Sequence, residues 1–405
     1  MSGPLSGYRV FDLTRILAGP TCTQILGDLG CDVIKIEQPG KGDDTRRFAP
    51  PYLKDDAGKE TGESAYFASS NRNKRSITLD LTKPEGQDLA RRLIEQSDIL
   101  VENFKVGGLA KYGLAYEQLK SDFPRLVYCS ITGFGHTGPY AKRPGYDVLI
   151  QAMGGFMSIT GEPDGNPQKA GVPIADLMAG MYATVAVNAA LCNRETTGKG
   201  QFIDIGMLDT QVATLSIMAL NYLATGENPL RLGNAHPNIV PYQSFSTADG
   251  DIVIAAANDD QFRRLCDFAG VAELARDEKF KTNESRVRNR DALIEKLEAV
   301  VSRHPSTHWL EGLVKVNVSC GPINTLEQVF NDPQVKARGM ELEMAHPAMG
   351  KNPARLIASP IKMSGTEPDY RHAPPTLGQH TEEVLKELLG LDAEAVAGLR
   401  ERAVV

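Results

Sequence analysis

Residues 7–37, GYRVFDLTRILAGPTCTQILGDLGCDVIKIE, carry the pattern that decides the fold. Two short runs rich in β-branched residues, 8–13 and 32–37, flank an apolar segment at 21–29 that has the spacing of a helix. Pro20 precedes this segment, and proline is favoured at the start of a helix. The stretch therefore predicts a strand, a helix and a second strand.

The same alternation continues further along the chain. It predicts strands at 76–81, 99–103 and 125–132 and a helix at 84–96. Alternating strands and helices are typical of a parallel α/β sheet, whose ligands bind at the carboxyl ends of the strands. Candidate ligand-binding residues are therefore expected in the loops that directly follow these strands.

The later sequence predicts a change of organisation. Residues 176–194 and 207–223 are rich in Ala, Met and Leu, which predicts buried helices. Gly, Pro and Asn accumulate at 224–250, and a predicted strand at 252–256 then opens a smaller unit. Two domains are also the natural expectation for a chain of 405 residues.

Composition and charge argue against several classes of function. The net charge of −7 argues against a nucleic-acid partner, which requires clustered Lys and Arg. The six cysteines lack CxxC spacing and the seven histidines lack HxxxH or HExxH spacing, so neither a metal site nor a disulfide framework is expected. Without a basic leader or a long apolar run, the sequence predicts a cytoplasmic protein that does not bind membranes.

Cations and hydrogen-bond donors follow successive predicted strands. They form three groups, at residues 71–75, at residues 103–105 and at Lys111. Each group alone is most simply a solvated charged face, but together they indicate a phosphate-bearing ligand. Phe104 beside Asn103 offers a surface on which a nucleotide base can stack, although phenylalanine is more often part of a core.

Two more residues are candidates for binding and chemistry. Arg15 follows the first predicted strand, where a guanidinium suits a carboxylate or a phosphate, and a surface salt bridge explains it equally well. The same loop lacks the GxGxxG pattern, so a dinucleotide cofactor is not indicated. Asp176, among small apolar residues, could be a helix N-cap or a partly desolvated nucleophile toward a thioester. The residues alone leave both roles open.

Ordered segments along the chain resemble the class III CoA-transferases. They include NRNKRSITLDL at 71–81, DILVENFKVGGLAKYGL at 98–114, ADLMAGMYA at 175–183 and LGQHTEEVLKELLG at 377–390. The resemblance implies an α/β fold with a Rossmann-like large domain, a smaller α+β domain and an interlocked homodimer. The expected boundaries are residues 1–224 for the N-terminal part of the large domain, 225–325 for the small domain and 326–405 for a return segment that completes the large domain.

The resemblance also implies a mechanism and a set of site residues. Asp176 would be the nucleophile, forming an aspartyl anhydride and an aspartyl-CoA thioester. The CoA contacts that carry over by position are Leu79, Asp80, Leu81, Thr82, Asn103, Phe104, Lys105, Lys111, Tyr146 and Asp147. The residues expected in the acyl pocket are Arg15, Leu17, Ala18, Arg46 and His236. Coenzyme A thioesters and carboxylic acids would be the substrates, with no tightly bound cofactor and no metal.

Departures from individual family members narrow the choice of substrate. Leu17 stands where formyl-CoA transferases have glutamine, which argues against formate or oxalate. Tyr146 stands where racemases of the same fold have the histidine that moves the α-proton. Segments 14–20, 42–46 and 234–245 instead resemble transferases that exchange CoA between succinyl-CoA and a short dicarboxylate such as glutarate, hydroxymethylglutarate or itaconate. The alternatives are an acyl-CoA racemase or isomerase and a non-catalytic CoA-binding protein.

Overall fold

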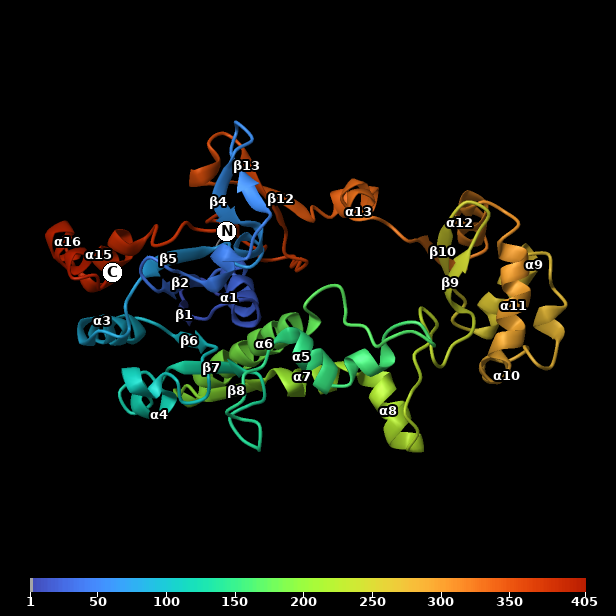
Figure 1. Cartoon of the computed structure of the whole chain (residues 1–405), viewed down its shortest axis with the longest axis horizontal. Helices are drawn as coiled ribbons and strands as arrows, with labels where there is room; N and C mark the ends of the chain where they lie inside the picture. Colours follow the sequence, from blue (N-terminus) through green and yellow to red (C-terminus); the bar gives the residue numbers. More distant parts are fainter. Residues whose placement is uncertain (1–2) are drawn as a thin grey trace. The chain divides into compact units, whose positions relative to one another are not determined.

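The computed structural model describes residues 3–405, which divide into two compact units. The large unit comprises the residues up to 156, residues 169–220 and residues 334–405, and the small unit comprises residues 157–168 and 221–333. The chain therefore leaves the large unit twice and returns to it with its C-terminal segment. Figure 1 shows the elements of each unit.

A six-stranded parallel sheet, in the order β5-β2-β1-β6-β7-β8, forms the centre of the large unit (Figure 1). Its strands are β1 (Arg9–Leu13), β2 (Asp32–Glu37), β5 (Lys74–Thr78), β6 (Ile99–Glu102), β7 (Val127–Thr132) and β8 (Phe202–Gly206). The mixed α/β fold with a large parallel sheet is confirmed. The sequence analysis does not predict β8, a strand of five residues with the charged Asp204 at its centre.

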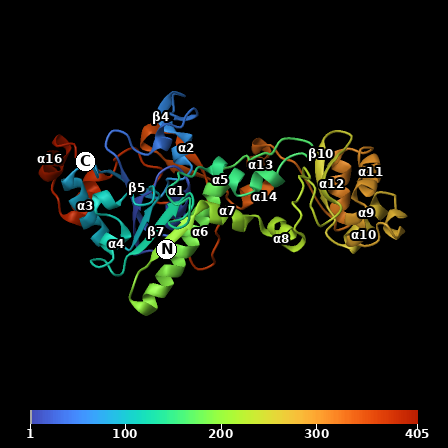
Figure 2. The ribbon, with the colours of Figure 1, turned by 60° about the horizontal axis from the view of Figure 1, so that its bottom comes forward.

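Helices cover both faces of the sheet. Successive strand residues point to opposite faces, so Phe11 and Ile34 belong to one apolar core while Val10 and Val33 belong to the other. On the Phe11 face lie α3 (Pro84–Glu95), α4 (Tyr116–Leu119), α15 (Thr381–Leu389) and α16 (Ala393–Glu401). On the Val10 face lie α1 (Ala18–Asp28), α5 (Asp147–Met153) and α6 (Ile174–Thr197). Figures 1 and 2 both show these two groups on either side of the strands.

Helix α6 packs closely against α1. A Cβ atom at Gly180 of α6 would lie 2.6 Å from the carbonyl oxygen of Ala18, so only glycine allows this approach. The contact brings the first turn of α6 next to the loop that follows β1. Among the described residues, α6 is also the one helix long and apolar enough to cross a membrane, a test that core helices of soluble proteins pass as well.

The helix predicted at 207–223 is interrupted. It is divided into α7 (Met207–Thr214) and α8 (Ser216–Thr225), because Ser216 has a φ of 47° and ends the regular helix. The large unit also contains two hairpins and a short helix. These are β3 (Tyr52–Lys54) with β4 (Glu60–Ser64), β12 (Glu341–Ala345) with β13 (Pro353–Ile357), and α2 (Ala65–Ala68).

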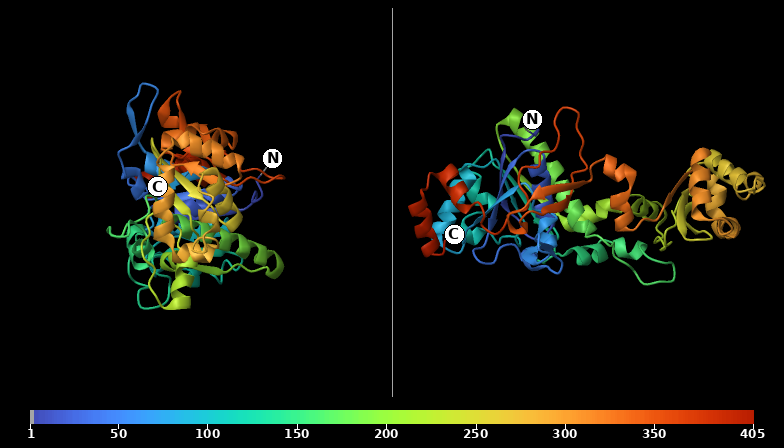
Figure 3. Two further views of the ribbon diagram at one scale, coloured as in Figure 1. Left: turned by 90° about the vertical axis from the view of Figure 1, so that its right-hand side faces the viewer. Right: turned by 90° about the horizontal axis from the view of Figure 1, so that it is seen from above.

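The C-terminal segment completes the large unit. In the right-hand view of Figure 3, the red C-terminal helices lie beside the blue and cyan N-terminal part of the chain. The backbone N–H of Asp80 donates to the carbonyl of Val404 at 2.8 Å, and that of His380 donates to Ser76 at 2.9 Å. The two ends of the chain therefore share one core, in which Val384 and Val396 are fully buried.

The small unit is a three-stranded antiparallel sheet packed against helices. The strand order is β11 (Ser319–Pro322), β10 (Asp251–Ala255), β9 (Tyr242–Ser246). The helices are α9 (Asp259–Phe268), α10 (Asn283–Arg288), α11 (Arg290–Val301), α12 (Ser306–Lys315) and α13 (Leu326–Asn331), followed by α14 (Pro333–Ala337) where the chain leaves the unit. Trp309, at 1% exposure, lies in its apolar core.

Candidate active site

Asp176 lies in the first turn of α6, with 9% of the residue exposed. Burial and, second to it, the charge of Asp147 raise the pKa of the Asp176 carboxyl to about 7. No hydrogen bond from the described residues offsets this burial. A carboxylate that has lost much of its hydration without gaining hydrogen bonds is a better nucleophile than a solvated one.

The interpretation of Asp176 as an N-cap is wrong. The N-cap position of α6 is held by Pro173, and the cap is supplied by a carboxylate from a different helix. Asp147 Oδ1 accepts the backbone N–H of Ala175 at 2.9 Å and that of Asp176 at 3.3 Å. Gln151 Nε2 donates to the other oxygen of Asp147 at 2.6 Å. Because Asp147 accepts the free backbone N–H groups at the start of α6, the Asp176 side chain is not needed as a cap and is left for another role.

A cavity of about 220 Å³ lies beside Asp176. The predicted site residues that line it are Arg15, Ala18, Asn103, Phe104, Lys105, Tyr146, Asp147 and Asp176. They come from the loop after β1, the loop after β6, the start of α5 and the start of α6. The carboxyl ends of parallel strands thus bring together side chains that are far apart in the sequence, at the edge where such sheets bind ligands.

A second cavity, of about 290 Å³, lies over the carboxyl ends of β1, β2 and β5. It is lined by four consecutive residues for which the sequence predicts a CoA contact: Leu79, Asp80, Leu81 and Thr82. Asp80 accepts hydrogen bonds from the backbone N–H and the hydroxyl of Thr82 at 2.9 and 2.6 Å, which fixes this turn. Arg15 and Phe104 line both cavities, so the two adjoin.

Lys111 lies at the border of the second cavity. It belongs to a short 3₁₀ turn, Ala110–Tyr112, and its ammonium stands 4.6 Å from the centre of the Tyr112 ring. Tyr112 lines the cavity, whereas Lys111 itself is exposed. An exposed cation close to a cavity suits a charged group that remains partly in solvent.

The two arginines predicted for the acyl pocket have different surroundings. Arg15 lines the cavity beside Asp176, and its half-exposed guanidinium pairs with the exposed carboxylate of Asp44 at 3.2 Å and lies 5.5 Å from the centre of the Phe104 ring. Arg46 is 10% exposed and donates to both oxygens of Glu37 at 2.7 and 2.8 Å and to Glu63 at 3.3 Å. A guanidinium paired in this way has little capacity for a substrate carboxylate, so the surroundings favour Arg15.

Leu17 and His236 are not among the residues that line these cavities. Leu17 is buried at the N-cap position of α1, and its neighbour Ile16 lines the cavity beside Asp176 instead. His236 belongs to the small unit, where its ring lies 5.2 Å from that of Tyr242. Its partial burial and the adjacent Arg290 lower the pKa of His236.

Sequence reasoning missed several residues of this region, among them Arg143, which also lines the cavity beside Asp176. Ile16 lines the cavity with a φ of 70°, a left-handed conformation that a β-branched residue rarely adopts and that no sequence pattern signals. Asp43 is buried at the wall of the second cavity, and its carboxylate accepts the backbone N–H of Ile16. Its only signal was its place in the segment 42–46, which belongs to the resemblance noted above.

Comparison with known proteins identifies the family of this chain. The model of CoA-transferase family III matches residues 5–381. The succinate–glutarate CoA-transferase of Agrobacterium fabrum is 47% identical, over 97% of this chain and 97% of its own length. The succinyl-CoA:glutarate CoA-transferase of Homo sapiens is 44% identical, over 99% of this chain and 90% of its own length.

Solved structures show the same likeness. A CAIB/BAIF family protein from Brucella suis has a TM-score of 0.84 and 49% identity, covering 96% of this chain and all of that chain (100%). A hypothetical protein from Mycobacterium tuberculosis has a TM-score of 0.82 and 30% identity, covering 94% of this chain and 99% of that chain. The chain therefore belongs to CoA-transferase family III and is an enzyme of the CoA-transferase class.

Proposed function

We propose that this enzyme moves CoA between succinyl-CoA and a short dicarboxylate, glutarate first among them, through covalent intermediates on Asp176. The names of the full-length relatives support the two acids. The observation that carries the mechanism is the buried carboxyl of Asp176, with a pKa of about 7, in a cavity that also contains the available guanidinium of Arg15. The cavity offers a nucleophile and a partner for the distal carboxylate of the substrate.

The proposed reaction conserves the thioester through four steps. An Asp176 oxygen attacks the carbonyl carbon of succinyl-CoA, and the C–S bond breaks to release CoA thiolate and a mixed anhydride. The thiolate attacks the aspartyl carbonyl, which expels succinate and leaves aspartyl-CoA thioester. The acceptor carboxylate attacks this thioester, giving a new anhydride and CoA thiolate. The thiolate then attacks the acceptor carbonyl, which releases the product thioester and the Asp176 carboxylate.

We assign the second cavity to the nucleotide part of coenzyme A. Its position at the carboxyl ends of β1, β2 and β5 is where parallel α/β sheets bind nucleotides, and Phe104 connects it to the cavity beside Asp176. Leu79 to Thr82 line it, Asn103 and Lys105 line the cavity beside Asp176, and we assign a phosphate contact to Lys111, whose neighbour Tyr112 lines the second cavity. Coenzyme A is a substrate here, and we propose no tightly bound cofactor.

Lys111→Ala should raise the KM for the acyl-CoA several-fold and leave the KM for the free acid nearly unchanged. A point charge on the rim contacts a phosphate remote from the reacting carbonyl, so its loss weakens binding more than chemistry. Lys120→Ala is the matched control, because that lysine is also exposed but pairs with Glu117 outside both cavities. Initial rates with each substrate varied in turn will measure this, and equal changes in both KM values would remove Lys111 from the CoA site.

The reaction rate should rise with pH through about 7, because Asp176 attacks only as a carboxylate and its pKa is about 7. Asp147→Asn keeps an oxygen that can accept the N–H groups of Ala175 and Asp176 but removes the nearby negative charge. Since that charge raises the pKa of Asp176, the variant should have its midpoint at lower pH. Profiles of kcat/KM for succinyl-CoA measure both effects, and identical midpoints would show that Asp147 does not tune Asp176.

The assembly is proposed to be an interlocked homodimer. Large apolar side chains are exposed in the single chain on α6, α7 and α8: Met181, Tyr182, Val185, Val212, Ile217, Leu220, Tyr222 and Leu223. Exposed apolar surface of this extent marks an interaction face. Threaded subunits can separate only by partial unfolding, so the dimer should persist at nanomolar concentration in analytical ultracentrifugation. Monomers under those conditions would contradict this assembly.

A cytoplasmic location is proposed on chemical grounds. All six cysteines are free, and four of them are buried. Reduced, unpaired cysteines are typical of the cytosol and unusual in secreted proteins. Fractionation of cells that express the tagged enzyme would test this, and a membrane or secreted fraction would contradict it.

One incubation tests the proposed function. Purified enzyme is mixed with succinyl-CoA and, separately, glutarate, hydroxymethylglutarate, itaconate or butyrate, and the acyl-CoA products are identified by mass spectrometry. We expect glutaryl-CoA with stoichiometric release of succinate. Conversion of a chiral acyl-CoA without exchange of the acid would instead identify an isomerase or racemase, and binding of succinyl-CoA without any product would identify a non-catalytic binding protein.

A further inference from the structure

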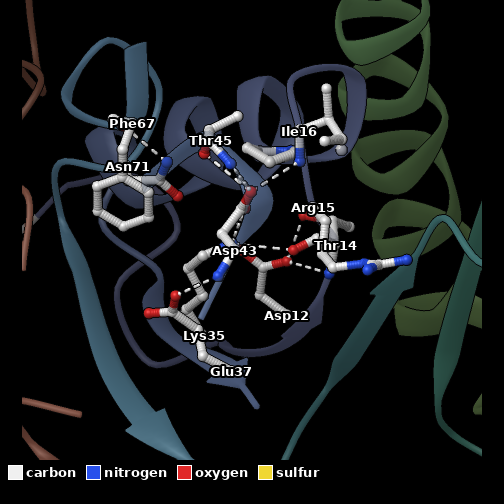
Figure 4. Close-up of polar contacts among 12 residues, drawn as sticks. Asp12, Thr14, Arg15, Ile16, Lys35, Glu37, Asp43, Thr45, Phe67 and Asn71 are labelled. Carbon is white, nitrogen blue, oxygen red and sulfur yellow. Dashed lines mark hydrogen bonds and ion pairs between the residues drawn. The ribbon is translucent and has the colours of Figure 1, made fainter. Parts of the chain in front are cut away.

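The loop Thr14–Ile16, which lines the proposed acyl pocket, is anchored by a buried ion pair (Figure 4). Lys35 Nζ donates to the carbonyl of Thr14 at 2.9 Å and to Asp43 Oδ2 at 2.9 Å. Asp43 Oδ1 accepts the backbone N–H of Ile16 at 3.2 Å. The pair thus holds the backbone on either side of Arg15.

The loop that this pair anchors has a strained backbone. Ile16 adopts a φ of 70°, which costs free energy for a β-branched residue and persists only where the surroundings enforce it. The backbone of Arg15 is fixed as well, since its N–H donates to Asn103 Oδ1 at 2.9 Å and its carbonyl accepts from Asn103 Nδ2 at 2.6 Å. Strained backbone of this kind is often found at functional sites.

Asp43 also holds the segment that carries the partner of Arg15. It is the N-cap of the 3₁₀ turn Asp44–Arg47, and its Oδ1 accepts the N–H and the hydroxyl of Thr45 at 3.0 and 2.8 Å. Asp44, the first residue of that turn, pairs with the Arg15 guanidinium at 3.2 Å. One carboxylate therefore fixes both the loop of Arg15 and the turn that begins at Asp44, and Figure 4 shows Asp43 between Ile16 and Thr45.

The Lys35–Asp43 pair is ionised and shielded from water. Both side chains have 0% exposure. Burial opposes ionisation, but the attraction of Lys35 and the bonds from Thr45 outweigh it and lower the pKa of Asp43 to about 2. Replacing a buried ion pair by apolar side chains is often neutral for stability, so stability alone does not explain charges at this place.

We propose that Asp43, together with Lys35, is the positioning residue for acid specificity in this enzyme, because it fixes Arg15 and Ile16 in the geometry that selects a distal carboxylate. The inference rests on the proposed function. Asp43 and Lys35 also line the second cavity, but Asp43 is not among the residues that line the cavity beside Asp176, so it acts on the acid through the backbone of the loop.

The test compares glutarate and butyrate as acceptors with acetyl-CoA as a donor that has no distal carboxylate. The ratio of kcat/KM for glutarate to kcat/KM for butyrate should be about tenfold or more lower in the Asp43→Asn enzyme than in the wild type. A change of this size corresponds to the loss of one charge-assisted contact. The matched control is Asp28→Asn, the same change in an equally buried pair, with Arg72, that does not contact the loop. It should lower stability and leave the ratio unchanged.

A double variant separates positioning from support of the fold. Lys35→Met with Asp43→Leu removes both buried charges, so thermal stability should return toward that of the wild type. The anchors on Thr14 and Ile16 remain absent, so the acid ratio should stay low. Recovery of the ratio together with stability would show that the pair is merely structural. If the Asn variant does not fold, the double variant decides alone.

Introducing Asp43→Asn into an Ile16→Gly enzyme tests whether Asp43 is needed to hold the strained backbone of Ile16. Glycine adopts positive φ without cost, so in Ile16→Gly the loop no longer needs enforcement at this position, and Asp43→Asn should change the ratio less there than in the wild type. An unchanged ratio in folded Asp43→Asn enzyme, with a wild-type enzyme that prefers glutarate, would overturn this inference alone. A wild-type enzyme without any preference for glutarate would instead refute the proposed function.

Discussion

Asp176→Ala should lower turnover by about 1,000-fold or more while CoA binding and folding persist. The other two carboxylates of the cavity are engaged, because Asp147 is bonded to the start of α6 and to Gln151 and Asp44 pairs with Arg15 and Arg47. Turnover from succinyl-CoA to glutaryl-CoA measures the loss, and retention of more than about a tenth of the wild-type rate would exclude Asp176 as the nucleophile. Binding of CoA by calorimetry serves as the control for an intact site.

Asp176→Asn should also be more stable than the wild type at pH 8. The folded protein raises the pKa of Asp176 from 3.8 to about 7, so the carboxylate costs stability, increasingly as pH rises from about 4 and fully above about 7. The amide carries no charge and avoids this cost. Thermal melts at pH 8 and at pH 4 measure the difference, which should be large at pH 8 and small at pH 4. If the variant and the wild type were equally stable at pH 8 as well as at pH 4, the claim that burial raises the pKa of Asp176 would be contradicted.

Arg15→Ala should reduce kcat/KM for glutarate by about 10- to 150-fold and leave that for butyrate nearly unchanged. The guanidinium of Arg15 lines this cavity together with Lys105 and Arg143, and a charge-assisted hydrogen bond from it to the distal carboxylate would contribute about 1.5–3 kcal/mol. Both acids are compared with acetyl-CoA, because succinyl-CoA would itself meet the same arginine.

Arg47→Ala is the matched control for Arg15. Arg47 pairs with the same Asp44, at 3.1 Å, but lines neither cavity. Its replacement should leave the ratio between glutarate and butyrate unchanged. A wild-type enzyme that prefers butyrate, or equal losses for the two acids in Arg15→Ala, would refute the assignment of Arg15.

The parallel sheet could be predicted from the sequence because its strands are apolar runs separated by helices. The first two residues of β5 could not be predicted as part of a strand, because Lys74 and Arg75 resemble a solvated charged face. The structure buries both and pairs them with Asp12 and Asp32. Such pairing joins residues far apart in the sequence, so a local pattern cannot reveal it.

The proposed nucleophile could be named from the sequence, whereas the residues that surround and support it could not. Asp176 was found through the resemblance, whereas the residues alone could not choose between a cap and a nucleophile. The choice depends on Asp147, a residue 29 positions earlier that caps α6 in its place. The conformation of Ile16 and its contact with Asp43 likewise depend on packing between segments, which only the folded chain shows.

The most direct test of the central claim is to trap the intermediate. Enzyme in steady turnover with succinyl-CoA and glutarate is treated with borohydride or hydroxylamine, digested and mapped by mass spectrometry. The account predicts a modified aspartyl side chain at Asp176 that appears only when an acyl-CoA is present. Modification of Asp147 or Glu37 instead, or product formation without any trapped adduct on Asp176, would contradict it.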